Sequence, residues 1–165
     1  MSLRNIVTWP DPVLSQVALP VPEITEEIRT LAADLLETMY AAPGRGLAAP
    51  QVGVLYRLFV MDATWKDGEP DPLVWINPEI VEYGPEVSIG EEGCLSIPGV
   101  AAQVERPASA HFVWTNLEGV VQDCWLDGFA ARCAQHEMDH LEGVTTLDRV
   151  DNAQRTALLT ALGAA

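Results

Sequence analysis

Positive charge is scarce in this sequence of 165 residues. Lys and Arg together number 9 against 24 Asp and Glu, which gives a formal net charge of -15. This charge would repel a phosphate backbone on average, and no run of Lys or Arg forms a local basic patch. We therefore expect no direct binding of nucleic acid.

Long apolar segments are also missing. No stretch approaches the length of a membrane span. The first 21 residues contain Asp11 and three prolines, where a signal peptide needs an unbroken apolar core. We expect neither a membrane segment nor a signal peptide.

Cysteine is sparse, and its spacing is not that of a disulfide scaffold. Cys94, Cys124 and Cys133 make an odd count, which fits reduced thiols in the cytoplasm. Apolar residues, by contrast, make up 48% of the chain, while charged residues make up 20%. This balance favours one globular domain over residues 1–165 with a full core.

Hydrophobic periodicity and turn residues predict the helices and strands. Thr25 is a typical N-cap for a helix near residues 26–40, where apolar residues recur at helical spacing. A break is expected at 43–46, a strand at 55–62, a polar loop at 64–72, and a strand–turn–strand unit over 73–83. A hairpin is expected around 116–119. A helix should follow from about 128, with Asp127 as its N-cap and Gly143 at its end, and a short C-terminal helix at about 152–162 behind Asp151. Because strands precede a central helix instead of alternating with helices, the pattern favours an α+β fold.

The segment "QHEMDH" (135–140) contains the H-E-x-x-H pattern of many metal-dependent hydrolases. On a helix, His136 and His140 differ by roughly 40° in direction and about 6 Å in rise, so both imidazoles can reach one ion. Glu137 would then take a proton from a water bound to that ion without being a ligand itself. The alternative is a helix with two incidental histidines and a solvated acid. The glutamate, the helix pattern and the caps together favour the metal site.

A catalytic metal site of this kind needs a third protein ligand and an open position. The last segment, 152–165, contains no acid and no histidine, and Thr146 stands where one class of proteases has a third histidine. Asp148 and Asp151 remain, whereas Glu142 lies too near the second histidine to complete the site easily. The usual protease arrangements are therefore poorly supported.

Four other residues are candidates for the third ligand: Cys94, His111, Cys124 and Cys133. With Cys133, the three ligands would span about 10 Å of straight helix, so this residue is better explained as pocket wall or core. Cys124 lies in an expected strand, where free cysteines usually serve packing, and His111 lies in a strand without a partner motif. Cys94 lies in the polar stretch "EEGCLSIPG" with carboxylates beside it, and this context favours it.

Three segments, in this order, resemble the peptide deformylases. "GRGLAAPQ" (44–51) is similar to the first motif of that family, Gly-x-Gly-apolar-Ala-Ala-x-Gln. "EGCLS" (92–96) is similar to the second motif and "QHEMDH" (135–140) to the third. The likeness runs from about residue 5 to 150, and three motifs in order that supply three ligands are very specific.

The resemblance implies a fold, a reaction and an ion. The fold is α+β, with antiparallel β-sheets around a central metal-binding helix. The reaction removes the formyl group from the N-terminal formyl-methionine of newly made proteins and releases formate. One divalent ion is implied, usually Fe²⁺, with Ni²⁺, Co²⁺ or Zn²⁺ able to occupy the site.

The resemblance also implies roles for individual residues. The implied metal ligands are Cys94, His136 and His140. Glu137 would be the general base that activates the water and then protonates the leaving amine. The side-chain amide of Gln51 and the backbone N–H of Leu95 would stabilise the oxyanion. Gly46 would let the chain pass close to the substrate and pair with its backbone.

A methionine side chain needs an apolar pocket, and the helix turn ahead of the histidines offers Phe129 and Cys133 as its wall. Arg45 stands where many members of the family have an aliphatic residue, and Arg132 where others place an apolar pocket residue. Each arginine would either contact an acidic group of the substrate or lie on the pocket rim.

The sequence also departs from the family pattern at Pro43 and in its C-terminal tail. Pro43 occupies a position that is often acidic in the family, so no ion pair can form from there to Arg106. Bacterial relatives use a basic C-terminal helix to dock at the ribosome, whereas the tail here carries only Arg155. The expected partner is the N-terminus of nascent formyl-Met polypeptides, with at most a transient ribosome contact.

Two alternatives to a deformylase stay open. The first is a metal-dependent amidase of the same fold that acts on another N-acyl substrate, which Arg45 and Arg132 would favour. The second is a metal-binding paralogue without turnover. A structural metal site needs neither a base nor an oxyanion donor, so the presence of Glu137 and Gln51 argues against the second.

Overall fold

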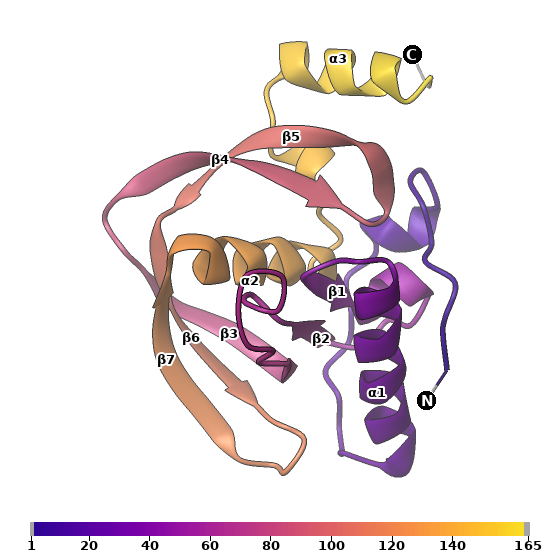
Figure 1. The fold of residues 1–165 in the computed structure, drawn as a ribbon, viewed down its shortest axis with the longest axis vertical. Helices are drawn as coiled ribbons and strands as arrows, with labels where there is room; N and C mark the ends of the chain where they lie inside the picture. The colour runs from indigo at the N-terminus through magenta and orange to yellow at the C-terminus, as the bar shows by residue number, and fades with distance from the viewer. Residues whose placement is uncertain (1, 164–165) are drawn as a thin grey trace.

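The computed structural model describes residues 2–163, whose arrangement is shown in Figure 1. Helix α2 (Gly128–Leu141) runs between a five-stranded sheet on one side and a two-stranded sheet on the other. All strand pairs in these sheets are antiparallel within the described residues. The expected α+β architecture around a central helix is therefore confirmed. No helix among residues 2–163 has the length and apolar character that crossing a membrane requires.

The larger sheet supplies the floor under α2. Its strands, in spatial order, are β1 (Gly46–Ala48), β2 (Leu58–Met61), β3 (Leu73–Tyr83), β6 (Ser109–Thr115) and β7 (Val121–Asp127). Side chains of β6 alternate between buried and half-buried, because successive residues of a strand point to opposite faces. The buried face packs on α2 through an aromatic group in which Trp75 stacks on Trp114 with ring centroids 3.7 Å apart. This rigid layer fixes the underside of the helix.

The smaller sheet is a hairpin of β4 (Val87–Cys94) and β5 (Ile97–Pro107) that covers the opposite side of α2. The short 3-10 helix η3 (Thr146–Asp148) and helix α3 (Asn152–Ala161) pack on the hairpin through Leu147 and Leu158. Helix α2 is therefore held between two separately packed layers.

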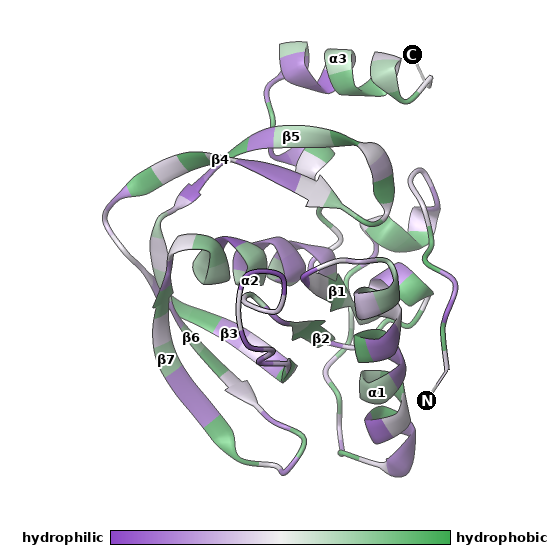
Figure 2. Ribbon diagram, viewed as in Figure 1, coloured by the Kyte–Doolittle hydropathy of each residue, from purple (hydrophilic) through white to green (hydrophobic). Residues whose placement is uncertain are grey.

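Helix α1 (Glu26–Ala41) closes the side of the molecule next to β1 and β2. In Figure 2, β1 and β2 are strongly hydrophobic, whereas α1 alternates between hydrophobic and hydrophilic stretches. This pattern is that of a helix with one buried face, which here packs on the largely buried strands β1 and β2. The 3-10 helices η1 (Pro12–Ser15) and η2 (Ala49–Val52) complete the structure on this side.

Most predicted helix ends are confirmed. The Thr25 side chain accepts a hydrogen bond from the N–H of Ile28, and Asp151 accepts one from the N–H of Gln154. Gly143 has a φ of 73°, the left-handed conformation that favours glycine after a helix C-cap. Asp127 occupies the N-cap position of α2, but its side chain caps no N–H there.

The predicted turn inside residues 73–83 is wrong. The segment forms one continuous strand, β3, whose pairing with β6 shifts register between Ile76 and Glu79. Asn77 adopts a φ of 49°, and its side-chain amide bonds both the N–H and the C=O of Val21. Asparagine tolerates the left-handed region, so the Asn-Pro pair produces a bulge here and not a turn.

The strand predicted at 55–62 is shorter than expected. Only Leu58–Met61 pair within the sheet, as β2. Before it, the backbone groups of Leu55 and Arg57 bond to Leu19 instead. The N-terminal segment thus competes for pairing that the hydrophobic pattern alone assigned to the sheet.

Candidate active site

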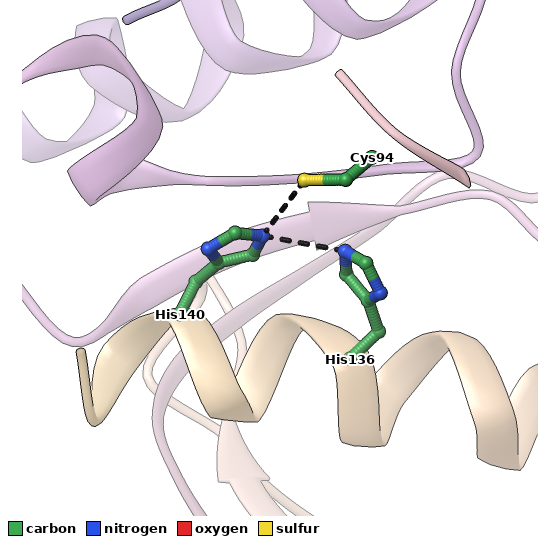
Figure 3. Close-up of side chains that lie close together, drawn as sticks. All are labelled: Cys94, His136 and His140. Carbon is green, nitrogen blue, oxygen red and sulfur yellow. Dashed lines mark hydrogen bonds between the residues drawn. The ribbon is translucent and has the colours of Figure 1, made fainter. Parts of the chain in front are cut away.

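Three side chains that are distant in sequence converge at one point between the hairpin and α2 (Figure 3). Cys94 is the last residue of β4, while His136 and His140 lie one turn apart on α2. The Nε2 atom of His140 is 3.4 Å from Cys94 Sγ and 3.3 Å from His136 Nε2. All three donor atoms lie within 4.8 Å of one another.

This geometry fits a tetrahedral metal ion. Metal–nitrogen bonds of about 2.0–2.1 Å and metal–sulfur bonds of about 2.3 Å place two nitrogens roughly 3.3 Å apart and a sulfur and a nitrogen roughly 3.5 Å apart. The observed separations of 3.3 and 3.4 Å match these values. Both histidines are buried, so the donor atoms face one another away from bulk water. The three residues therefore form a Cys/His/His metal site.

A buried ionic network orients one of the ligands. Glu92 on β4 accepts a hydrogen bond from His136 Nδ1 at 2.9 Å, which turns Nε2 toward the other donors. Arg106 on β5 grips the same carboxylate with two nitrogens, at 2.6 and 2.9 Å. Burial opposes the charge of Glu92, but the hydrogen bonds from His136 and Arg106 lower its pKa to about 2. Glu92 therefore stays ionised.

The network continues along α2. Asp139 binds Arg106 at 2.9 Å and Arg149 at 2.7 Å, so one carboxylate joins β5, α2 and the segment after it. Pro43 plays no part in this network. Arg106 forms its ion pairs with Glu92 and Asp139 instead. The sequence analysis missed both acids. For Glu92, the signal in the sequence was the pair Glu91-Glu92, which Gly93 separates from Cys94.

Glu137 lies beside the ligand group without joining it. The residue is 4% exposed, and its Oε1 atom has no hydrogen-bond partner among the described residues. Burial raises the pKa of this carboxyl to about 7. A carboxyl that titrates near neutral pH is suited to accept and return a proton.

Gln51 approaches the same point from the other side. Its Nε2 atom is 3.7 Å from Cys94 Sγ and donates to Ser96 Oγ at 3.1 Å. Its Oε1 atom accepts from the N–H of Ala48, so the amide group is held in one orientation. The donor end of the amide therefore faces the metal site. Leu95 follows Cys94 in the turn of the hairpin.

Gly46 on β1 makes room for Glu137. A Cβ atom at this position would lie 2.6 Å from Glu137 Oε2 and 2.9 Å from Cδ. No side chain of an L-residue fits there without moving the carboxylate. The glycine therefore permits a close approach between β1 and the buried acid.

We expect Gly46→Ala to lower kcat for amide hydrolysis by about 100-fold, because a displacement of about 1 Å of a reacting group has that effect. The fold should survive, since only one side chain has to move. The measurement is initial rate together with the thermal unfolding midpoint. Gly68→Ala is the matched control, because its Cβ would meet only one backbone oxygen at 3.8 Å. A fully active Gly46→Ala variant would contradict the prediction.

A cavity of about 770 Å³ opens beside the site. Phe129 and Cys133 from α2, which the sequence analysis proposed as the wall of an apolar pocket, line this cavity. Cys133 also belongs to the core beneath the helix. Arg45 lies at the cavity with its guanidinium 4.8 Å from the centre of the Phe129 ring and its Nη2 atom 2.8 Å from Asp67.

Arg132 also lines the cavity, but its guanidinium is used by the protein. Nη1 donates to Glu92 and to the C=O of Val104, each at 2.8 Å, and Nη2 donates to the C=O and Oγ of Ser88, each at 3.0 Å. Both terminal nitrogens therefore already have acceptors.

The other candidates for the third ligand lie away from the site. Cys124 is half-buried in β7 and packs at the edge of the core under α2, as expected. His111 on β6 pairs with Asp123 and stacks on Trp125, which is a structural role. Neither residue belongs to the metal-ligand group found among the described residues.

Comparison with known proteins agrees with this geometry. A family model described as polypeptide deformylase matches residues 3–156. A peptide deformylase of Rhizobium meliloti (strain 1021) is 48% identical over 159 residues, which cover 96% of this chain and 91% of that protein. A peptide deformylase of Novosphingobium aromaticivorans is 42% identical over an alignment of 178 positions, which covers 96% of this chain and 95% of that protein.

Solved structures show the same likeness in three dimensions. A peptide deformylase from Legionella pneumophila matches with a TM-score of 0.91 at 37% identity, covering 98% of this chain and 94% of that one. A peptide deformylase from Synechococcus elongatus, in complex with actinonin, matches with a TM-score of 0.90 at 44% identity, covering 97% of this chain and 86% of that one. Since both kinds of likeness extend over nearly the whole chain, it belongs to the polypeptide deformylase family.

Proposed function

We propose that Glu137, Gln51 and Leu95 carry the chemistry of this chain, a metal-dependent hydrolase that removes the N-formyl group from nascent polypeptides. The observation that supports these roles most directly is the position of Glu137. It is a buried carboxyl whose Oε1 has no hydrogen-bond partner within residues 2–163, next to three metal ligands and at the wall of a cavity.

Glu137 serves as the proton carrier in this proposal. A divalent ion held by Cys94, His136 and His140 would lower the pKa of a bound water and so supply a nucleophile at neutral pH. Glu137 would take one proton of the attacking water as the water oxygen bonds to the formyl carbon. When the formamide C–N bond breaks, Glu137 would pass this proton to the leaving amine, and formate is released. Burial holds its pKa near 7, which suits both halves of this transfer.

Gln51 and Leu95 stabilise the charge that develops on the formyl oxygen. One donor, the N–H of Ala48, and one acceptor, Ser96 Oγ, already fix the Gln51 amide, so its Nε2 can donate without first reorienting. The N–H of Leu95 lies in the turn directly after the cysteine ligand. We assign it as the second donor to the oxyanion.

The substrate enters along β1 and the cavity. Strand β1 is an edge strand of the larger sheet and Gly46 lines the cavity, so an extended peptide can pair with the backbone there. Phe129 and Cys133 form the apolar wall for the methionine side chain. Arg45 lies at the rim, held by Asp67 and Phe129.

The proposed native ion is Fe²⁺, with Ni²⁺, Co²⁺ or Zn²⁺ able to replace it. One thiolate and two imidazoles suit each of these ions. The thiolate brings more negative charge to the ion than a third imidazole would, which makes the bound water more basic and a nearby proton acceptor more useful.

The proposed partner is the N-terminus of a nascent formyl-Met polypeptide in the cytoplasm. The three cysteines are free, and a thiolate ligand must stay reduced. Any ribosome contact would be transient, because the net charge of -15 and the lone Arg155 of the C-terminal helix provide no basic docking surface.

The test is formate release from a formyl-Met-Ala peptide by the Fe²⁺- or Ni²⁺-loaded protein, with acetyl-Met-Ala as the matched substrate control. We expect formate release and no acetate release. Hydrolysis of other acyl peptides without formate release would identify an amidase of different specificity. Hydrolysis of no acyl peptide would identify a binding protein.

A further inference from the structure

Arg132 stands one helical turn before His136 and two turns before His140, so the three side chains lie along one face of α2. The facing strand β4 has a matching row. Ser88, Gly90, Glu92 and Cys94 alternate along it, and each meets this face of the helix. The strand and the helix that share the metal site are therefore also joined by Arg132.

Glycine at residue 90 lets the guanidinium of Arg132 pack directly against strand β4. A Cβ atom at Gly90 would lie 2.8 Å from Arg132 Nε and 2.9 Å from Cζ. The side chain of Arg132 is 13% exposed, so the guanidinium lies inside the wall of the site and not free at its rim. Its terminal nitrogens point to Glu92, Val104 and Ser88, and none points to a group that a substrate would replace.

Glu92 needs the hydrogen bond from Arg132 for a complete set of donors. An ionised carboxylate has about four acceptor positions. At Glu92 these receive two nitrogens of Arg106, one of Arg132 and Nδ1 of His136. Arg106 holds the carboxylate from β5, and Arg132 holds it from α2. Without Arg132, Glu92 Oε2 keeps a single donor and the carboxylate can turn away from the histidine.

We propose that Arg132 is a positioning residue of the metal site, which acts through Glu92 on His136 and does not bind the substrate. The pair of Gly90 and Arg132 forms a clamp between the strand that carries Cys94 and the helix that carries the histidines. The proposal rests on the proposed function only for the identity of the site, because its main measurement is metal affinity and not turnover.

Three single variants separate the possible roles. Arg132→Met removes the donors and keeps an unbranched side chain, and Arg132→Lys keeps the charge but not the planar fork that reaches several acceptors. Gly90→Ala keeps the arginine at position 132 but displaces its guanidinium from strand β4. Arg29→Met is the matched control, since Arg29 is an exposed residue of α1.

The experiment measures the Co²⁺ dissociation constant by chelator competition, the visible Co²⁺ spectrum, and kcat and KM for formyl-Met-Ala. We expect each of the three variants to bind Co²⁺ about tenfold more weakly, as is typical when an outer partner of a ligand is lost. Their spectra should change because the imidazole of His136 is no longer held, while KM stays at the wild-type value. Arg29→Met should match the wild type throughout.

A double variant tests whether Arg132 acts only by filling space. Arg132→Leu with Gly90→Ala refills the volume with apolar groups, so we expect it to recover the unfolding midpoint but not the Co²⁺ affinity. Recovery of both would overturn the proposal, as would a raised KM with unchanged Co²⁺ affinity in Arg132→Met. Should Arg132→Met fail to fold, Arg132→Lys and Gly90→Ala still decide. Absence of formate release by the wild type would refute the proposed function and leave the affinity comparison intact.

Discussion

Glu137→Gln should lower kcat for a formyl-Met-Ala peptide by about 10²- to 10⁴-fold, the usual contribution of a general acid–base group. The amide of glutamine has nearly the volume of the carboxyl, so the narrow space beside Gly46 stays filled. It cannot, however, take a proton from water and return it to the leaving amine. The measurement is formate release at saturating substrate.

Metal content separates this loss from damage to the ligands. Glu137 is not part of the metal-ligand group found among the described residues. Glu137→Gln should therefore keep a full equivalent of Co²⁺ after dialysis. Glu118→Gln, an exposed change in the β6–β7 turn, should keep both metal and activity. Retained turnover in Glu137→Gln would remove Glu137 from the mechanism and require another proton acceptor.

Cys94→Ser should weaken metal binding by more than the roughly 10- to 100-fold that loss of an outer partner of a ligand costs. A serine hydroxyl stays protonated at neutral pH and binds these ions poorly, whereas a cysteine in a metal site is a thiolate. The two histidines alone leave an ion with half of its tetrahedral ligands. The measurement is the Co²⁺ or Zn²⁺ dissociation constant by chelator competition.

Cys124→Ser is the matched control, because Cys124 lies half-buried in β7, away from the ligand group. It should bind metal as the wild type does. The opposite pattern, with metal kept in Cys94→Ser and lost in Glu137→Gln, would overturn the assignment of the ligands.

Short-range patterns predicted the parts of the fold that depend on neighbouring residues. The caps at Thr25 and Asp151 and the glycine after α2 were predictable because each involves groups within one helical turn. Asn77 was misjudged because its conformation depends on Val21, which is 56 residues away. A dipeptide that usually makes a turn became a bulge because a distant backbone offered it two hydrogen bonds.

The same distinction applies to the site. The motifs showed the types of metal ligand and their order. They did not show the hydrogen bonds and ion pairs that orient those ligands. Glu92 meets Arg106 and His136 only when β4, β5 and α2 come together. For Arg132, the sequence showed an unusual charge beside a pocket, but its role depends on the missing side chain of Gly90, which no local pattern reveals.

The placement of Cys94 on one layer and of both histidines on another links metal binding to conformational stability. An ion that binds only when the β4–β5 hairpin and α2 are packed together stabilises the folded state by mass action. The apparent unfolding midpoint should therefore rise with the concentration of free metal. The hairpin also depends on η3 and α3 for its apolar packing. Backbone amides of β4 should therefore exchange with solvent faster when the ion is chelated, while those of β3 and β6, in the floor beneath the helix, keep their protection.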